Sequence, residues 1–100
     1  MNDLVGGSTA ARLEFDGVVD FVTAPQIQQR GVELMGRPGL HTLVADLAKV
    51  TFIDSSGLSL LVYLKGRCDE RGVQLELQHV PRRARALIDS LGLGAYFALN

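Results

Sequence analysis

Apolar and polar residues recur along the chain with two different periods, and the changes of period predict its strands and helices. The segment from Ala11 to Phe21 contains Asp16-Gly17 at its centre, and before this pair Leu13 and Phe15 alternate with Arg12 and Glu14. Asp-Gly is a common hairpin turn pair, so we predict two strand pieces here. Residues 43–47 are apolar on both faces, which is typical of a central strand, and residues 50–53 extend or follow it. Strict alternation over 73–78 predicts a strand with one solvated face.

The first helix is predicted to begin near Thr23. Thr23 can cap it, Gln26 stands three residues later as in a capping box, and Pro25 is tolerated in the first turn. Gly36 and Pro38 are expected to end this helix.

Two further segments have helical spacing. One runs from about Ser55 to Arg71 and is stopped by Gly72, and the other opens at Pro81 and ends at Gly92. The expected order is β-β-α-β-α-β-α, with a right-handed parallel crossover between residues 43 and 77.

This order predicts the α/β class, with helices packed on a small mixed sheet of about four to five strands. One hundred residues suffice for a single domain, 1–100. The first eight residues are expected to be loose or to form a short edge strand.

The predicted helix that starts at Ser55 has apolar residues on two sides. At about 100° per residue, one face packs on the sheet. It consists of Gly57, Leu60, Leu61, Leu64 and Cys68. The other side carries Ser55, Leu58, Ser59, Val62 and Gly66. Apolar residues that the core does not need suggest a docking surface for a protein partner.

Asp54 precedes this helix, where its carboxylate can accept the free backbone N–H groups of the first turn. The docking surface is therefore predicted to comprise seven residues: Asp54, Ser55, Ser56, Leu58, Ser59, Val62 and Gly66. A phosphate on a hydroxyl here would add about −1.5 to −2 charges. The fold would tolerate it at a helix amino end, whereas a docked partner would not.

Composition and charge exclude several classes of function. Hydrophobic residues make up 47% of the chain and its net charge is −1, so we expect a globular protein without direct DNA binding or membrane insertion. The basic run Arg82-Arg83-Ala84-Arg85 is expected to be a solvated helix start. Cys68 is the only cysteine and the first residues do not form a signal peptide, which suits the cytoplasm.

Enzymatic chemistry is not expected. Neither Ser55 nor Ser56 lies in a Gly-x-Ser-x-Gly turn, and there is no phosphate-binding Gly-Lys-Ser/Thr loop. Asp46 lies at a strand end but lacks an upstream acidic pair for magnesium. His41 and His79 are not spaced as metal ligands, so no metal or cofactor is predicted.

Several segments of the chain resemble the STAS domain family. They are Val44-Ala45-Asp46-Leu47, the element from Phe52 to Leu58 that contains Asp54-Ser55-Ser56-Gly57, an opening around Phe15–Asp20 with Thr23-Ala24-Pro25, and an ending from Leu91 to Phe97.

The resemblance implies a function in two alternative branches. In anti-sigma factor antagonists, the serine after the aspartate is phosphorylated by the kinase that also acts as the anti-sigma factor, and by position this is Ser55. Asp54 would then help to position the contact. In the second branch, a small STAS subunit binds the ATPase of a phospholipid-transporting ABC complex. Ser59, where antagonists often have glycine, and the short chain favour that branch, whereas the intact Phe-Ile-Asp-Ser-Ser-Gly favours the antagonist.

Overall fold

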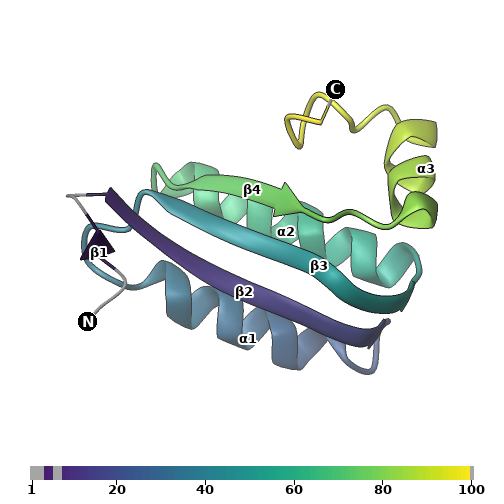
Figure 1. Cartoon of the computed structure of the whole chain (residues 1–100), viewed down its shortest axis with the longest axis horizontal. Helices are drawn as coiled ribbons and strands as arrows, with labels where there is room; N and C mark the ends of the chain where they lie inside the picture. The colour runs from purple at the N-terminus through teal and green to yellow at the C-terminus, as the bar shows by residue number, and fades with distance from the viewer. Residues whose placement is uncertain (1–3, 6–7, 100) are drawn as a thin grey trace.

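The computed structural model describes residues 4–5 and 8–99. Its elements alternate between strand and helix along most of the chain (Figure 1). They are β1 (Leu4–Val5), β2 (Ser8–Val19), α1 (Ala24–Met35), β3 (Thr42–Ile53), α2 (Ser55–Glu70), β4 (Gln74–Gln78) and α3 (Arg82–Ser90). The predicted α/β class is confirmed, and so is the order of strands and helices, but the first two strands are the short edge strand β1 and an unbroken β2 instead of two pieces within Ala11–Phe21.

The sheet has the strand order β1-β2-β3-β4. Strands β2, β3 and β4 are parallel, and the two-residue β1 pairs antiparallel with β2, so the sheet is mixed and lies at the low end of the predicted strand count. Both crossovers move across the sheet in the same direction. Because such crossovers are right-handed, α1 and α2 lie on the same face, as Figure 1 shows.

The hairpin predicted at Asp16-Gly17 is wrong. Strand β2 runs without a turn from Ser8 to Val19 and stays parallel to β3, with register shifts between Glu14 and Asp16 and between Gly17 and Val18. Gly17 has φ +73°, which glycine adopts at no steric cost. At each shift β3 contributes one more residue than β2, so the bulges lie in β3 and the Asp-Gly pair stays in the ladder between them, paired with Lys49 and Val50.

The capping box predicted for α1 is also wrong, although the helix begins where expected. Thr23 occupies the N-cap position without a side-chain bond into the helix. Its Oγ1 instead donates to the carbonyl of Val18 at 2.8 Å and accepts from the N–H of Asp20 at 3.0 Å. Thr23 thus closes the turn between β2 and α1.

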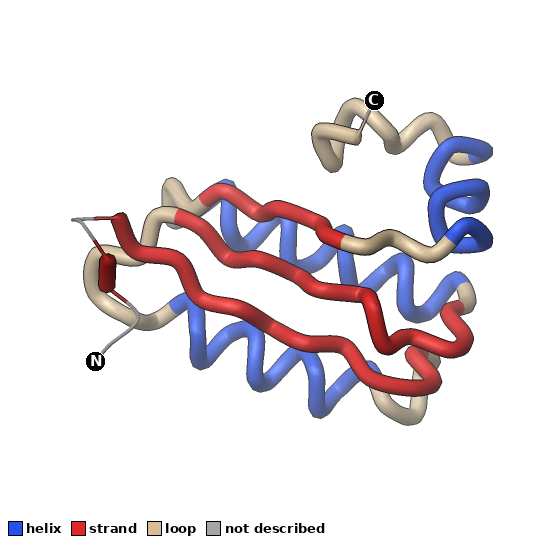
Figure 2. The backbone as a smooth tube through the Cα atoms, viewed as in Figure 1, coloured by secondary structure: helices blue, strands red, loops and turns tan. Residues whose placement is uncertain are grey.

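Strand β3 is the centre of the sheet and outlasts its neighbour β4. It pairs with β4 only from Thr42 to Asp46, whereas its pairing with β2 continues to Ile53. Figure 2 shows β3 continuing beyond the end of β4, where the chain leaves the sheet toward α3. The last residues of β3 therefore have no strand on that side within the described chain.

The core lies between the sheet and the helices. Its largest fully buried side chains include Phe15, Leu47, Leu61, Leu64 and Phe97. The C-terminal segment reaches α2, where the ammonium of Lys65 lies 5.2 Å from the ring centre of Tyr96. No helix in residues 4–5 and 8–99 is long and apolar enough to cross a membrane.

Candidate functional site at the amino end of α2

Helix α2 is capped by Asp54. Its Oδ1 accepts the N–H groups of Ser56 at 2.9 Å and Gly57 at 3.2 Å, as its position in the sequence predicts. The N–H of Asp54 in turn donates to the carbonyl of Val19 at 3.4 Å. The start of α2 is therefore fastened to the ends of β3 and β2.

Gly57 allows this close seating of the helix. A Cβ atom at this position would lie 2.5 Å from Cγ1 of Ile53 and 2.8 Å from the carbonyl oxygen of Val19. These separations are shorter than ordinary carbon contacts, which lie near 3.5–4.0 Å. Glycine here has a packing role that fixes the position of the two serines before it.

The hydroxyl-bearing residues of this region differ in exposure. Ser55, the first residue of α2, is exposed, as is Ser59 one turn later, whereas Ser56 is half-buried. No hydrogen bond engages the hydroxyl of Ser55 within the described part of the chain. Because Asp54 supplies the cap, the side chain of Ser55 is accessible and is not needed to start the helix.

One of the apolar residues predicted to face outward is placed differently. Leu58 is only 5% exposed and belongs to the hydrophobic core, so the expectation that it projects from the outer side of α2 is wrong. Val62 is 36% exposed, as predicted, and Gly66 has open space where a Cβ would lie. At about 100° per residue, Leu58 lies about 100° around the helix from the buried Gly57 and about 60° from the buried Leu61, so the core takes a wider arc than predicted.

A second exposed apolar group, which was not predicted from the sequence, lies in the turn between β2 and α1. Phe21 is 75% exposed and Val22 is 67% exposed. The turn is held by Asp20, whose Oδ1 accepts the N–H groups of Val22 at 3.0 Å and Thr23 at 3.1 Å. The sequence feature that could have predicted this exposed group is the pair of large apolar residues between Asp20 and Thr23, two residue types that favour turns.

This turn and Ser55 are neighbours because they follow paired strand residues, Val19 and Ile53. One step earlier, Val18 and Phe52 are also paired and both are exposed. We call the exposed apolar residues at these two strand ends the docking patch: Val18, Phe21, Val22 and Phe52. The arrangement places an accessible hydroxyl beside an apolar surface, which is typical of protein interfaces.

Asp46 lies away from this site, and its carboxylate is engaged in hydrogen bonds that connect strands of the sheet. Its carboxylate is 2.7 Å from Nη1 of Arg12 and 2.9 Å from Nδ1 of His79, and it accepts the N–H of Ala48 at 3.0 Å. The hydrogen bonds from His79 and Ala48 hold the pKa of Asp46 below its ordinary value, although burial opposes them. Asp46 thus links β2, β3 and, through His79, the end of β4.

Cys68 is fully buried in α2, with its Sγ 3.6 Å from Sδ of Met35. Burial raises the pKa of its thiol to about 11, so it is a small core residue rather than a nucleophile at neutral pH. The described residues contain no group of three or more His, Cys, Asp or Glu side chains that could hold a metal ion.

The fold and the site together define a small α/β domain that carries an exposed hydroxyl at the amino end of the helix after its central strand. The sequence matches the STAS domain over residues 5–100, and the chain belongs to this family. No curated protein matches the sequence.

Solved structures share the fold at low sequence identity. A sulfate transporter family protein from Wolinella succinogenes has a TM-score of 0.76 at 21% identity, covering 94% of this chain and 74% of that one. The STAS domain of a SulP transporter from Vibrio cholerae has a TM-score of 0.69 at 17% identity, covering 88% and 67%. The unphosphorylated anti-sigma factor antagonist SpoIIAA has a TM-score of 0.68 at 16% identity, covering 86% and 77%.

Proposed function

We propose that the protein is a non-enzymatic, cytoplasmic partner-switching regulator. Its unmodified form binds an anti-sigma factor that is also a serine kinase, and phosphorylation of Ser55 by that kinase ends the binding. The observation that carries the proposal is the exposed Ser55 hydroxyl beside Asp54, in a chain whose fold is shared with the antagonist SpoIIAA.

The geometry supports a switch that acts on binding and leaves the fold intact. Ser55 is exposed and the helix cap is made by Asp54, so a phosphate can be added without breaking a hydrogen bond of the described chain. A docked partner would have to desolvate a group of nearly two negative charges, with the Asp54 carboxylate next to it. The docking patch, together with Val62, would supply the apolar area that holds the unmodified partner.

The first test compares Ser55→Glu and Ser55→Ala in co-purification from the native cell, with intact-mass measurement of the parent protein. The parent should carry a phosphoryl group at Ser55 in part of the population, Ser55→Ala should bind the partner without being modified, and Ser55→Glu should lose it. Gln74→Glu is the matched control, because it adds the same charge at an exposed residue. Gln74 lies at the amino end of β4, which is the other end of the sheet from Ser55. A Ser55→Glu protein that retains the partner as well as Gln74→Glu would contradict the proposal.

The second test probes the docking patch. Phe21→Ser removes a side chain that is 75% exposed, so it should weaken partner binding with little change in the free energy of unfolding. Val62→Asp tests the exposed side of α2 in the same assay. Leu58→Asp is unsuitable for this purpose, because Leu58 is buried and its substitution would damage the core.

A second candidate uses the same surface without modification: an accessory STAS subunit that binds the ATPase of a phospholipid-transporting ABC complex. It is supported by the fold shared with a sulfate transporter family protein, at a TM-score of 0.76, and with the STAS domain of a SulP transporter, at 0.69. Co-purification with an ATPase, loss of that contact in Phe21→Ser and no phosphorylated form in the intact mass would support this candidate over the first.

A further inference from the structure

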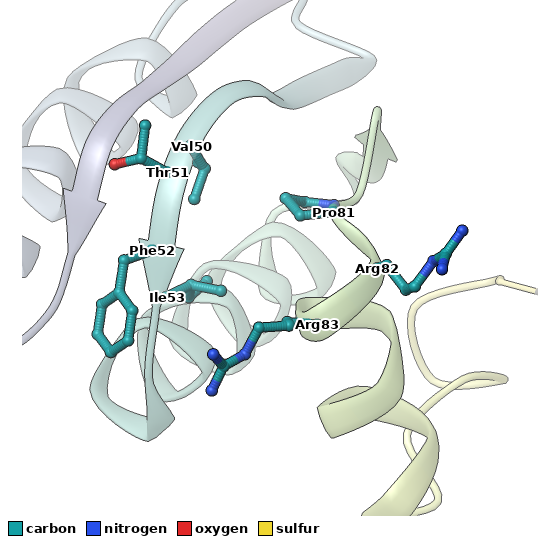
Figure 3. Close-up of a pocket in the computed structure, with 7 residues that line it drawn as sticks. All are labelled: Val50, Thr51, Phe52, Ile53, Pro81, Arg82 and Arg83. Atoms are coloured by element: carbon teal, nitrogen blue, oxygen red, sulfur yellow. The ribbon is translucent and has the colours of Figure 1, made fainter.

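A pocket of about 230 Å³ lies between the end of β3 and the start of α3. It exists because β3 continues past the end of β4, and the chain then turns through Pro81 into α3. Val50 and Ile53 point toward Pro81 and Arg83 across the pocket, whereas Phe52 points to the other side of the strand (Figure 3). Thr51 and Phe52 also line the pocket, although the Phe52 ring points away from Pro81.

The two walls of the pocket differ in character. The β3 wall has the apolar side chains of Val50 and Ile53, and Pro81 adds an apolar ring opposite. Arg82 and Arg83 line the same pocket and both are exposed, but only the Arg83 side chain points toward β3, whereas that of Arg82 points away from it (Figure 3). No ion pair or hydrogen bond within residues 4–5 and 8–99 engages either guanidinium, whereas the nearby Arg85 pairs with Asp89 at 3.2 Å.

The backbone adds to the positive character of the arginine wall. Pro81 at the N-cap makes no side-chain bond to α3, and the first turn contains no acidic residue. The first intrahelical bond runs from the N–H of Arg85 to the carbonyl of Pro81, which leaves the earlier N–H groups without a partner in the described helix. The arginines thus stand at an uncompensated helix amino end, in contrast to the start of α2, where Asp54 is the cap.

We propose that this pocket binds a small phosphate ester of an apolar alcohol or phenol. The apolar group would lie against Val50, Ile53 and Pro81, and the phosphate would face Arg83 and the uncapped start of α3. At neutral pH the phosphate carries nearly two negative charges, and its oxygens fit the donor geometry of the Arg83 guanidinium.

The size of the pocket limits the ligand. A cavity of about 150 Å³ is known to hold one benzene molecule, so this pocket has room for one ring or a branched chain of similar size together with part of its acidic group. The site goes beyond the proposed regulatory function, because it requires neither Ser55 nor a protein partner.

The test is an NMR titration of the ¹⁵N-labelled full chain with phenyl phosphate at neutral pH and low ionic strength. The expected result is saturable shifts of the amides of residues 50–53 and 82–84. Inorganic phosphate should bind more weakly because it lacks the apolar group, and benzyl alcohol should bind more weakly because it lacks the charge.

Two charge reversals make the test specific. Arg83→Glu should weaken phenyl phosphate binding by about tenfold or more, because it removes one charge-assisted contact and adds repulsion. Arg83 is exposed, so the variant should stay folded, which its unfolding curve checks. Arg30→Glu is the control, because it makes the same charge change at an exposed site on α1.

The proposal is overturned if phenyl phosphate causes no saturable shifts, or if the shifts map elsewhere. Equal affinity for inorganic phosphate and phenyl phosphate would also overturn it, since the apolar wall would then play no part. So would an equal loss of affinity in Arg30→Glu and Arg83→Glu. None of these results depends on whether Ser55 is phosphorylated.

Discussion

Replacing Gly57 by alanine tests whether close seating of α2 on the sheet holds the candidate site in place. The added Cβ would meet Cγ1 of Ile53 at 2.5 Å and the carbonyl oxygen of Val19 at 2.8 Å. The oxygen belongs to the backbone of a paired strand, so it cannot move away by a change of rotamer. Overpacking of this kind costs about 1–3 kcal/mol, which exceeds the gain from alanine's helix propensity at the third residue of a helix.

Gly66→Ala in the same helix is the matched control. Nothing lies within 4 Å of a Cβ at Gly66, so this variant should be more stable than the parent by up to about 1 kcal/mol. The two substitutions make the same chemical change with opposite expected signs.

Urea unfolding measures both variants, and a change in midpoint without a change in slope reports stability alone. In thermal unfolding, each kcal/mol should shift the Tm by roughly 4–8 °C for a chain of this size. If Gly57→Ala is as stable as the parent, or gains as much as Gly66→Ala, the argument that glycine is required by the approach of β2 and β3 is refuted.

Three further predictions follow from the same structure. Asp54→Ala should lower the free energy of unfolding by about 1 kcal/mol, because two N–H groups lose their acceptor, and urea unfolding measures the loss. Asp46 has a lowered pKa when folded, so its contribution is present above its ordinary value of 3.8 and is lost as the pH falls through the folded pKa. The stability difference between the parent and Asp46→Asn should therefore shrink in acid, and a difference that grows there would contradict this assignment. Cys68, with its pKa raised from 9.0 to about 11, should react with a thiol reagent at neutral pH only when the protein unfolds, and the fold should lose stability as the pH rises through that range. Rapid labelling of the native protein would show that Cys68 is not buried.

The segments of the fold with a regular hydrophobic period were predictable because each buries one face and exposes the other. In β4, Leu75 and Leu77 are buried while Gln74 and Glu76 are exposed, so alternation alone reveals the strand. The Asp-Gly pair in β2 was misread because a hairpin turn and a strand position beside a bulge of the partner strand can both use a glycine with positive φ. Only the partner strand decides between them, and β3 lies more than twenty residues further along the chain.

The candidate site was predictable where local backbone chemistry determines it. The carboxylate of Asp54 caps α2 as an acid before a helix should, and Ser55 is exposed beside it. The exposed Phe21 and the buried Leu58 were missed, since both depend on tertiary packing. Helical periodicity gives the direction of the core but not the width of the arc that it covers.

The cap made by Asp54 has a consequence for any group attached to its neighbour. The N–H groups of Ser56 and Gly57 already point at the Asp54 carboxylate, so a phosphate on Ser55 would find these donors occupied. The new charge would remain directed at the solvent, ready to be read by another molecule. The two adjacent residues therefore have separate roles. Asp54 caps the helix, and a modification of the Ser55 hydroxyl would leave that cap intact.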